Sequence, residues 1–264
     1  MALIEVKERI RKKKRRRRKR ILLAILIIVV LGLGLAIMKS SWLDTKLVTF
    51  TGNLKIPTAY LEKESQKLKG ENLLLISKKD VLPFLEQKAY FLDVKVHKKF
   101  PDKLILEITE KTPEINYISD GVINLLTNEG VILETATNLL EGGLMLLDEQ
   151  SLPKEGKNLY PDEVNKQKLI QKFRELQIRN ESDIIFDTLD LKNMTNIKTY
   201  YEDLEIWLGY PEDLKEKLNA AINIIAEGQI MGVKGYVDVS YLDNPVVFDE
   251  SRVTPTEAIE TPTE

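Results

Sequence analysis

The 264-residue sequence contains no cysteine and a single histidine, His97. Without cysteine the chain has no disulfide framework, no zinc-finger or iron–sulfur site and no cysteine nucleophile. A single histidine also excludes histidine-rich metal sites and most Ser-His-Asp triads. The sequence contains no Gly-x-x-x-x-Gly-Lys or Gly-x-Gly-x-x-Gly loop that would hold a nucleotide. We therefore predict no catalytic residue, no cofactor and no metal site.

Charge is distributed unevenly along the chain, although the formal net charge is only −2. Residues 1–20 contain twelve Lys or Arg and two Glu, so they carry +10, and the other 244 residues carry −12. Residues 21–38 then contain no charged and no polar side chain. A helix of this length covers roughly 27 Å, close to the bilayer core of about 30 Å. We predict a basic cytoplasmic tail over 1–20 and a transmembrane helix over 21–38.

Two other interpretations of the N-terminal segment carry less weight. A cleaved signal peptide has a shorter apolar run and small residues at its cleavage site, which Ala36-Ile37-Met38-Lys39 does not provide. A basic run is also found in nucleic-acid binding, but its position directly before an apolar run makes membrane topology the simpler cause. The positive-inside rule then keeps the N-terminus in the cytoplasm. We expect a single-pass cell-membrane protein whose later domains lie outside the cytoplasm, without a nucleic-acid partner.

The residues after the span predict a small unit with the order strand, helix, helix, strand, strand. A short strand over 47–50 precedes a helix that begins at Pro57-Thr58 and ends near Lys69. Alternating apolar residues predict two further strands, over 92–97 and 104–109, which pair as a hairpin. The two helices are expected to cover one face of this sheet.

The start of the second helix is open between two N-cap residues, Ser77 and Asp80. Proline is tolerated only in the first turn of a helix, and Pro83 lies six residues after Ser77. We therefore favour the later start, with Asp80 as the cap. Val81, Phe84, Leu85 and Ala89 mark the buried stripe of this helix.

Four stretches of this unit form a family pattern. They are residues 48–53 (VTFTGN), 71–74 (ENLL), 94–104 (VKVHKKFPDKL) and 107–113 (EITEKTP). Together, in this order and directly after a signal anchor, they resemble the POTRA domain of the bacterial division family FtsQ/DivIB. The resemblance implies a POTRA domain over 44–113.

The second unit, over 114–248, predicts a mixed α/β domain with an antiparallel-rich sheet. Strands are expected in 116–127, 131–133, 184–191, 204–208 and 235–241, and helices after Asp162 and Pro211. The clearest helix follows Pro211, because apolar residues recur on one face at Leu214, Leu218, Ala221, Ile222 and Ile225. The layout resembles the β domain that follows POTRA in the same family, mainly in residues 126–133, 207–218 and 236–240. The whole chain is thus expected to be an α+β protein with one transmembrane helix.

Residues 249–264 are rich in proline, threonine and glutamate and carry a net charge of −4. Their apolar residues are too few to form a core. We predict a disordered acidic tail.

Three sequence features resemble functional sites, but for each of them we predict a purely structural role. His97 lies on the polar face of a predicted strand with Asp93, Lys95 and Lys99, so we expect a solvated residue. Ser151 to Lys154 matches the Ser-x-x-Lys nucleophile motif, but Pro153 obstructs the helix that this motif needs. For Trp207, packing in the core of a two-sided sheet is favoured over an exposed partner contact.

The predicted partner-binding site is the last strand, which consists of Gly235, Tyr236, Val237, Asp238, Val239, Ser240 and Tyr241. A terminal strand often lies at a sheet edge, where a partner can add a strand through backbone hydrogen bonds. A central or covered strand is the alternative. The family resemblance implies that FtsL- and DivIC/FtsB-type proteins bind the C-terminal part of the β domain.

The resemblance implies a divisome scaffold at the septum, without enzyme activity, that links its partners to septal wall synthesis. A septal penicillin-binding protein is a further candidate partner. The alternative function is a membrane-anchored exported cell-wall hydrolase. That enzyme would need a compact cleft with a carboxylate of raised pKa.

Overall fold

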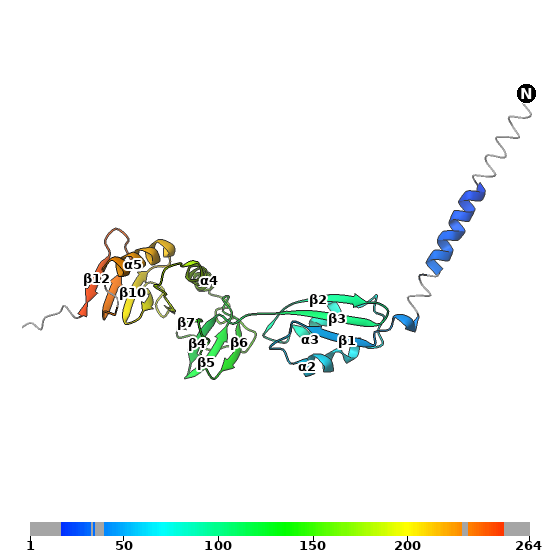
Figure 1. Ribbon diagram of the computed structural model, residues 1–264, viewed down its shortest axis with the longest axis horizontal. Helices are drawn as coiled ribbons and strands as arrows, with labels where there is room; N and C mark the ends of the chain where they lie inside the picture. The colour runs from blue at the N-terminus through cyan, green and yellow to red at the C-terminus, as the bar shows by residue number, and fades with distance from the viewer. Residues whose placement is uncertain (1–16, 33, 35–39, 229–231, 251–264) are drawn as a thin grey trace, which may run out of the picture. The chain divides into compact units, whose positions relative to one another are not determined.

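The computed structural model describes residues 17–32, 34, 40–228 and 232–250. Contacts divide the chain into two units, Met1–Glu110 and Lys111–Glu264. Residues 17–32 are helical (Figure 1). Within the described ranges, no helix is long and apolar enough to cross a membrane. The predicted span over 21–38, the basic tail and the acidic tail all extend into residues outside these ranges.

The first unit contains a three-stranded sheet in the order β1-β3-β2. The central strand β3 (Lys103–Glu110) pairs in parallel with β1 (Leu47–Thr51) and antiparallel with β2 (Phe91–Lys99). The predicted hairpin is therefore confirmed, with the Phe100-Pro101-Asp102 segment as its turn. The POTRA fold predicted for this part of the chain has the expected element order.

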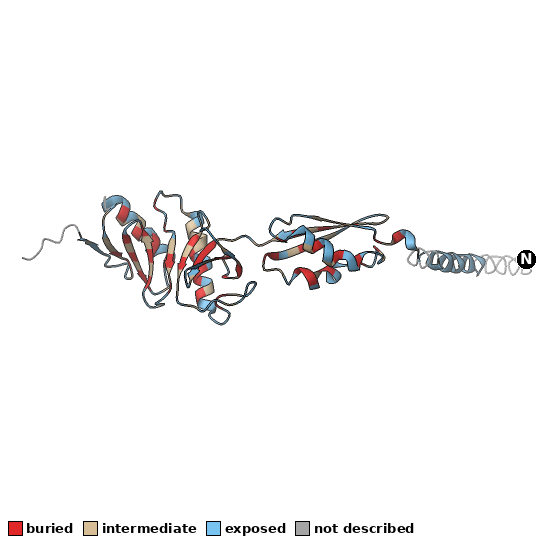
Figure 2. Ribbon diagram, turned by 90° about the horizontal axis from the view of Figure 1, so that it is seen from below, coloured by how far each residue is buried: buried red, intermediate tan, exposed pale blue. Residues whose placement is uncertain are grey.

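Helical segments cover one face of this sheet. They are α2 (Thr58–Glu64), η2 (Ser65–Leu68) and α3 (Lys78–Leu85), whereas the short η1 (Ser41–Leu43) precedes β1 at the end where the chain enters the unit. The side chains of Leu61, Val81 and Phe84 are fully buried, as are those of Leu104 and Leu106 on β3. Figure 2 shows buried positions in red on both the helices and the strands of this unit.

The predicted start of the second helix at Asp80 is wrong, because α3 begins at Lys78 with Ser77 as its N-cap. The Asp80 carboxylate accepts hydrogen bonds from the Ser77 backbone N–H at 2.7 Å and from its hydroxyl at 2.8 Å. This capping box fixes the earlier start and satisfies groups that a helix end leaves without partners. Pro83 is consequently accommodated inside the helix rather than in its first turn.

The second unit contains a nine-stranded sheet in the order β12-β11-β10-β9-β8-β7-β4-β5-β6. The strands are β4 (Ile115–Ser119), β5 (Val122–Leu126), β6 (Ile132–Ala136), β7 (Leu144–Leu147), β8 (Thr188–Asp190), β9 (Ile197–Tyr201), β10 (Leu204–Gly209), β11 (Gly235–Asp238) and β12 (Val246–Asp249). Five of the eight neighbouring pairs are antiparallel and three are parallel. The prediction of a mixed, antiparallel-rich sheet is confirmed.

Two helices contribute to the core of the second unit, α4 (Val164–Arg179) and α5 (Leu214–Gly228). The predicted stripe of α5 is confirmed, since Leu214, Leu218, Ala221 and Ile225 are buried, while Ile222 is only partly buried. The four buried residues of α5 belong to one core with Leu204, Ile206 and Leu208 of β10.

Several strands differ from the prediction. The segment 184–191 forms only the three-residue β8, and the segment 235–241 ends as a strand at Asp238. The strand β12 was not expected, and it includes Asp249, where the acidic tail was predicted to begin.

Candidate partner-binding edge of the second sheet

The strand predicted to lie at the sheet edge is an interior strand. β11 pairs in parallel with β10 on one side and antiparallel with β12 on the other. The prediction that residues 235–241 present a free edge is therefore wrong, and the covered-strand alternative describes them. The edge belongs to β12, whose Val246-Val247-Phe248 sequence has the β-branched and aromatic composition of a strand.

The predicted site residues separate into a strand and a turn. Gly235, Tyr236, Val237 and Asp238 form β11, and the Val239 backbone N–H continues the pairing by donating to the Trp207 carbonyl at 2.9 Å. Ser240 donates its backbone N–H to the Asp238 carboxylate at 2.8 Å. Val237 and Val239 are buried, but Tyr241, which lies in the turn after the strand, is 75% exposed.

Two glycines permit the close packing of this edge. A Cβ atom at Gly235 would lie 1.9 Å from the carbonyl oxygen of Phe248, and its φ of +152° disfavours other residues. At Gly209, with φ of +65°, a Cβ atom would lie 2.8 Å from the Cβ of Ser240. Glycine at these two positions lets β12 and the segment after β11 approach their neighbours.

Three aromatic rings stack across the last three strands. The centroids of the Trp207 and Tyr236 rings are 4.1 Å apart, and the two ring planes make an angle of 6°. The centroids of the Tyr236 and Phe248 rings are 5.2 Å apart, and their planes make an angle of 20°. This ladder lies on the sheet face opposite the buried Ile206, since side chains alternate along a strand. The favoured interpretation of Trp207 as a core residue is therefore wrong, because its ring is only half-buried.

Polar contacts fix the position of the ladder. The Trp207 indole N–H donates to the Glu205 carboxylate at 2.8 Å, and Lys198 donates to the same carboxylate at 2.8 Å. These hydrogen bonds, with that of Lys198 first, lower the pKa of Glu205 and keep it charged. The Lys198 ammonium also lies 5.0 Å from the Trp207 ring centroid. These contacts hold the Trp207 ring in place.

The backbone of β12 presents hydrogen-bonding groups away from the sheet. The Glu250 N–H donates to the Lys234 carbonyl at 2.9 Å, in line with the antiparallel register of β11 and β12. Bonded positions alternate along an antiparallel strand, so the N–H groups of Val246 and Phe248 face β11. Those of Val247 and Asp249 point away from it. The side chains of Val246, Val247 and Phe248 are 44%, 46% and 37% exposed.

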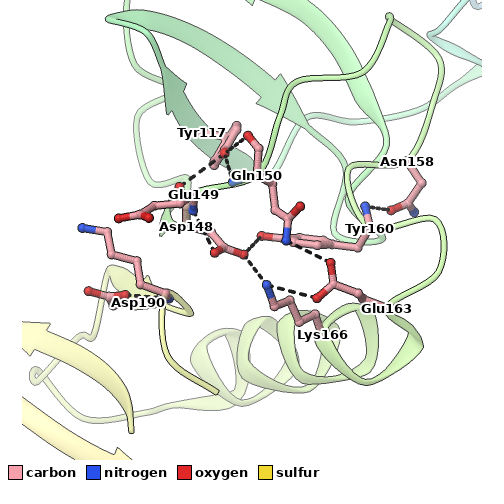
Figure 3. Close-up of polar contacts among 10 residues, drawn as sticks. Tyr117, Asp148, Glu149, Gln150, Asn158, Tyr160, Glu163, Lys166 and Asp190 are labelled. Carbon is pink, nitrogen blue, oxygen red and sulfur yellow. Dashed lines mark hydrogen bonds and ion pairs between the residues drawn. The ribbon is translucent and has the colours of Figure 1, made fainter. Parts of the chain in front are cut away.

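A buried polar network lies elsewhere in the second unit (Figure 3). The Asp148 carboxylate, just after β7, accepts from the Tyr160 hydroxyl and from the Lys166 ammonium of α4, both at 2.8 Å. The Lys166 ammonium also lies 3.2 Å from the Glu163 carboxylate.

The charge states in this network favour a role in stabilising the fold. Burial opposes the charge of Lys166, but hydrogen bonds to Asp148 and Glu163 outweigh it and raise the pKa of Lys166. Burial, reinforced by Asp148, raises the pKa of Tyr160 far above its usual range. The lysine therefore stays charged and the phenol neutral at physiological pH. The network fixes the start of α4 to the segment that follows β7.

The described lining of the cleft between α4 and α5 lacks the carboxylate that a hydrolase would need. A cleft of about 330 Å³ between α4 and α5 has Lys172, Arg179 and Lys215 in its lining, and no Asp or Glu among the described residues that line it. Residues 151–154 are not helical, so the Ser-x-x-Lys spacing does not bring Lys154 beside Ser151. His97 is exposed, as predicted, and its Nε2 lies 2.8 Å from the Glu107 carboxylate. This hydrogen bond, together with the charge of Lys95, lowers the pKa of Glu107.

Fold and sequence together define a POTRA-containing protein of the FtsQ type. Residues 44–111 match the family described as POTRA domain, FtsQ-type. The chain is 31% identical over 216 residues to the cell division protein DivIB of Clostridium botulinum (strain Hall), covering 81% of this chain and 84% of that protein. DivIB of Clostridium acetobutylicum is 28% identical to this chain, and the match covers 79% of this chain and 84% of that protein. DivIB of Clostridium tetani is 27% identical, and the match covers 80% of this chain and 81% of that protein.

The chain belongs to the DivIB family of cell division proteins. The predicted family is therefore confirmed, together with the prediction of a non-enzymatic division protein.

Residues of the family pattern have structural roles in the first unit. The Glu110 carboxylate accepts the backbone N–H groups of Leu54, Lys55 and Ile56 at 3.0, 2.9 and 2.8 Å. Gly52 has φ of +81°, and a Cβ atom there would lie 2.2 Å from the Ile108 carbonyl oxygen. The pattern thus marks the turn after β1 and its attachment to β3.

Proposed function

We propose that the protein is a membrane-anchored scaffold of the division complex, acting at the septum with its N-terminus in the cytoplasm. The apolar run over 21–38 follows twelve basic residues, the arrangement of an uncleaved signal anchor. The described part of this run is helical, and its large apolar side chains from Ile21 to Leu31 are exposed. A lipid environment would cover these side chains. Both folded units would then lie outside the cytoplasm.

The scaffold holds FtsL- and DivIC/FtsB-type partners through strand addition at β12. The observation that carries this proposal is the outward direction of the Val247 N–H group on the last described strand of the sheet. An extended partner segment forms backbone hydrogen bonds with such an edge, and its side chains select the site. The aromatic ladder ends at Phe248, so a partner side chain can extend the stack by one ring.

Membrane confinement makes modest contacts sufficient for this function. Proteins held in one bilayer meet at a high effective concentration, so each interface can be small. A four-residue edge strand is adequate under this condition. The assembled partners, including a septal penicillin-binding protein, would connect the scaffold to wall synthesis.

Hydrogen exchange on the full-length protein in lipid nanodiscs tests this proposal. Addition of the exported segments of DivIC- and FtsL-type proteins is expected to protect the amide of Val247. The amides of Val246 and Phe248 serve as the internal control, because they already face β11 and should change less. Protection confined to the first unit, or none at all, would contradict the proposed edge.

A further inference from the structure

Exposed apolar side chains gather at one end of the first unit. Among residues 40–110, seven large apolar side chains are exposed. Five of them lie at the end where the chain enters the unit: Trp42, Leu47, Leu74, Leu75 and Phe100. The other two, Leu54 and Leu92, belong to the opposite end, beside the last residue of β3 and the first residues of β2.

Hydrogen bonds join the three segments that carry these five side chains. The backbone N–H groups of Lys46 and Leu47 donate to the Asp102 carbonyl at 2.9 and 3.2 Å, which ties the start of β1 to the β2–β3 turn. The Leu73 N–H donates to the Leu43 carbonyl at 2.8 Å. In Figure 1 the start of β1 and the arrowhead of β2 lie at the same end of the sheet.

Lysines surround the apolar side chains at this end. Lys46 precedes β1, Lys99 ends β2 and Lys103 begins β3. The carboxylate of the turn, Asp102, lies 3.4 Å from the Lys46 ammonium and so is already paired. Lysine stems pack along apolar surfaces while their ammonium groups reach water or phosphate. Aromatic rings with flanking lysines are typical of surfaces that lie at a lipid headgroup layer.

Covalent connection places this end close to the bilayer. Trp42 lies four residues beyond the end of the predicted span at Met38, and four extended residues reach at most about 14 Å. Phe100 is far from the span in sequence, but the turn that carries it is tied to Lys46 and Leu47.

We propose that this end, defined by Trp42, Leu47, Leu74, Leu75 and Phe100, lies on the outer surface of the cell membrane. The Trp42 and Phe100 rings enter the headgroup layer, while Lys99 and Lys103 contact the phosphates of anionic lipids. This inference depends on the membrane anchor of the proposed function. It adds a second, peripheral lipid contact that fixes one end of the POTRA unit at the bilayer. A lipid surface is favoured over a protein partner because the patch combines lysines with rings and is covalently held at the membrane.

Quenching of tryptophan fluorescence by brominated lipids tests the inference on the full-length protein in phosphatidylglycerol-containing nanodiscs. Trp42 and Trp207 are the two tryptophans of the chain, so Trp42→Phe/Trp207→Phe provides a silent background. One reporter is Phe100→Trp in the turn. The matched control is Leu92→Trp, near the start of β2 and so at the opposite end from the turn that carries Phe100. The two side chains are similarly exposed, at 57% for Leu92 and 59% for Phe100. A third protein, Trp207→Phe alone, keeps Phe100 and reports from Trp42.

The expected result is quenching at position 100 and little at position 92, with weaker quenching at 100 when phosphatidylcholine replaces the anionic lipid. Equal quenching at both positions, or none at position 100, would overturn the inference. Co-elution of the protein with the nanodiscs reports on the anchor separately. A protein that fails to enter the discs would contradict the proposed function, whereas one that enters without quenching at position 100 contradicts only the lipid contact.

Discussion

At the scale of single residues, Glu110 shows how a family pattern acts through structure. Its carboxylate accepts three backbone N–H groups of the turn after β1. Hydrogen bonds to a charged group contribute about 1.5–3 kcal/mol each in protein interiors, and exposure reduces this. We expect Glu110→Ala to lower the free energy of unfolding of the first unit by about 2 kcal/mol in total. Glu110→Gln should lose less, since its amide oxygen still accepts. Urea denaturation checks both, and equal stability of all three proteins would contradict this role.

The ion pair between Lys166 and Asp148 gives a second prediction at this scale. Both side chains are nearly inaccessible, at 10% and 5% exposure. Removing one partner of a buried pair leaves an uncompensated charge, so Lys166→Met should lower the free energy of unfolding by about 3 kcal/mol. Lys172→Met is the matched control on the same helix, because Lys172 pairs with Glu175 on the surface. Such exposed pairs contribute little, and a similar loss in both variants would contradict the account.

The same network predicts sensitivity to high pH. The pKa values of Tyr160 and Lys166 are raised in the folded protein. Their contribution to stability is therefore complete below the unfolded-state pKa values of about 10 and is lost as the pH rises through the folded-state values. The free energy of unfolding, measured between pH 8 and 11, should fall above pH 10 in the wild-type protein. Tyr160→Phe should show a shallower fall, and an unchanged slope would contradict the assignment.

At the scale of elements, β12 depends on a glycine in its neighbour. A Cβ atom at Gly235 would meet the Phe248 carbonyl oxygen at 1.9 Å, within the pairing of β11 and β12. We expect Gly235→Ala to separate β12 from the sheet and to abolish partner binding. In hydrogen exchange, the amides of Val246 and Phe248 should lose protection while those of β10 keep it. Retained protection of β12 in this variant would show that the strand accommodates the methyl group by another route.

The elements that the sequence predicted well are those with long periodic patterns. The β2–β3 hairpin and α5 follow from alternation and from an apolar stripe, both of which are local signals. The strands that were missed are short, and their formation depends on neighbours distant in the sequence. β12 has only four residues, and its last residue, Asp249, lies where the sequence predicts the acidic tail to begin.

The candidate site was predicted only in part, because it too depends on strands that are distant in the sequence. The sequence located the C-terminal strands but not which of them forms the edge, because this depends on pairing across the whole sheet. The side chain of Trp207 alternates with buried leucine and isoleucine, yet its ring stacks on Tyr236 of the neighbouring strand and is not part of the core cluster. The pattern of one strand does not contain this information.

At the scale of the whole molecule, two surfaces account for a division scaffold. The proposed lipid contact fixes one end of the POTRA unit at the membrane, and the proposed partner edge is β12, the last of the described strands at one side of the second sheet. Neither surface requires a chemical step, in agreement with membership in a non-enzymatic division family. The scaffold would act by holding membrane proteins together.

The most direct test of this account is calorimetric titration of the nanodisc-held protein with the exported segments of DivIC- and FtsL-type partners, comparing Val247→Pro with Val247→Thr. Proline removes the outward N–H of β12 and leaves the bonds to β11, whereas threonine keeps that N–H. Binding is expected to be lost with proline and retained with threonine. Equal binding by both folded variants would show that partners do not add a strand at β12.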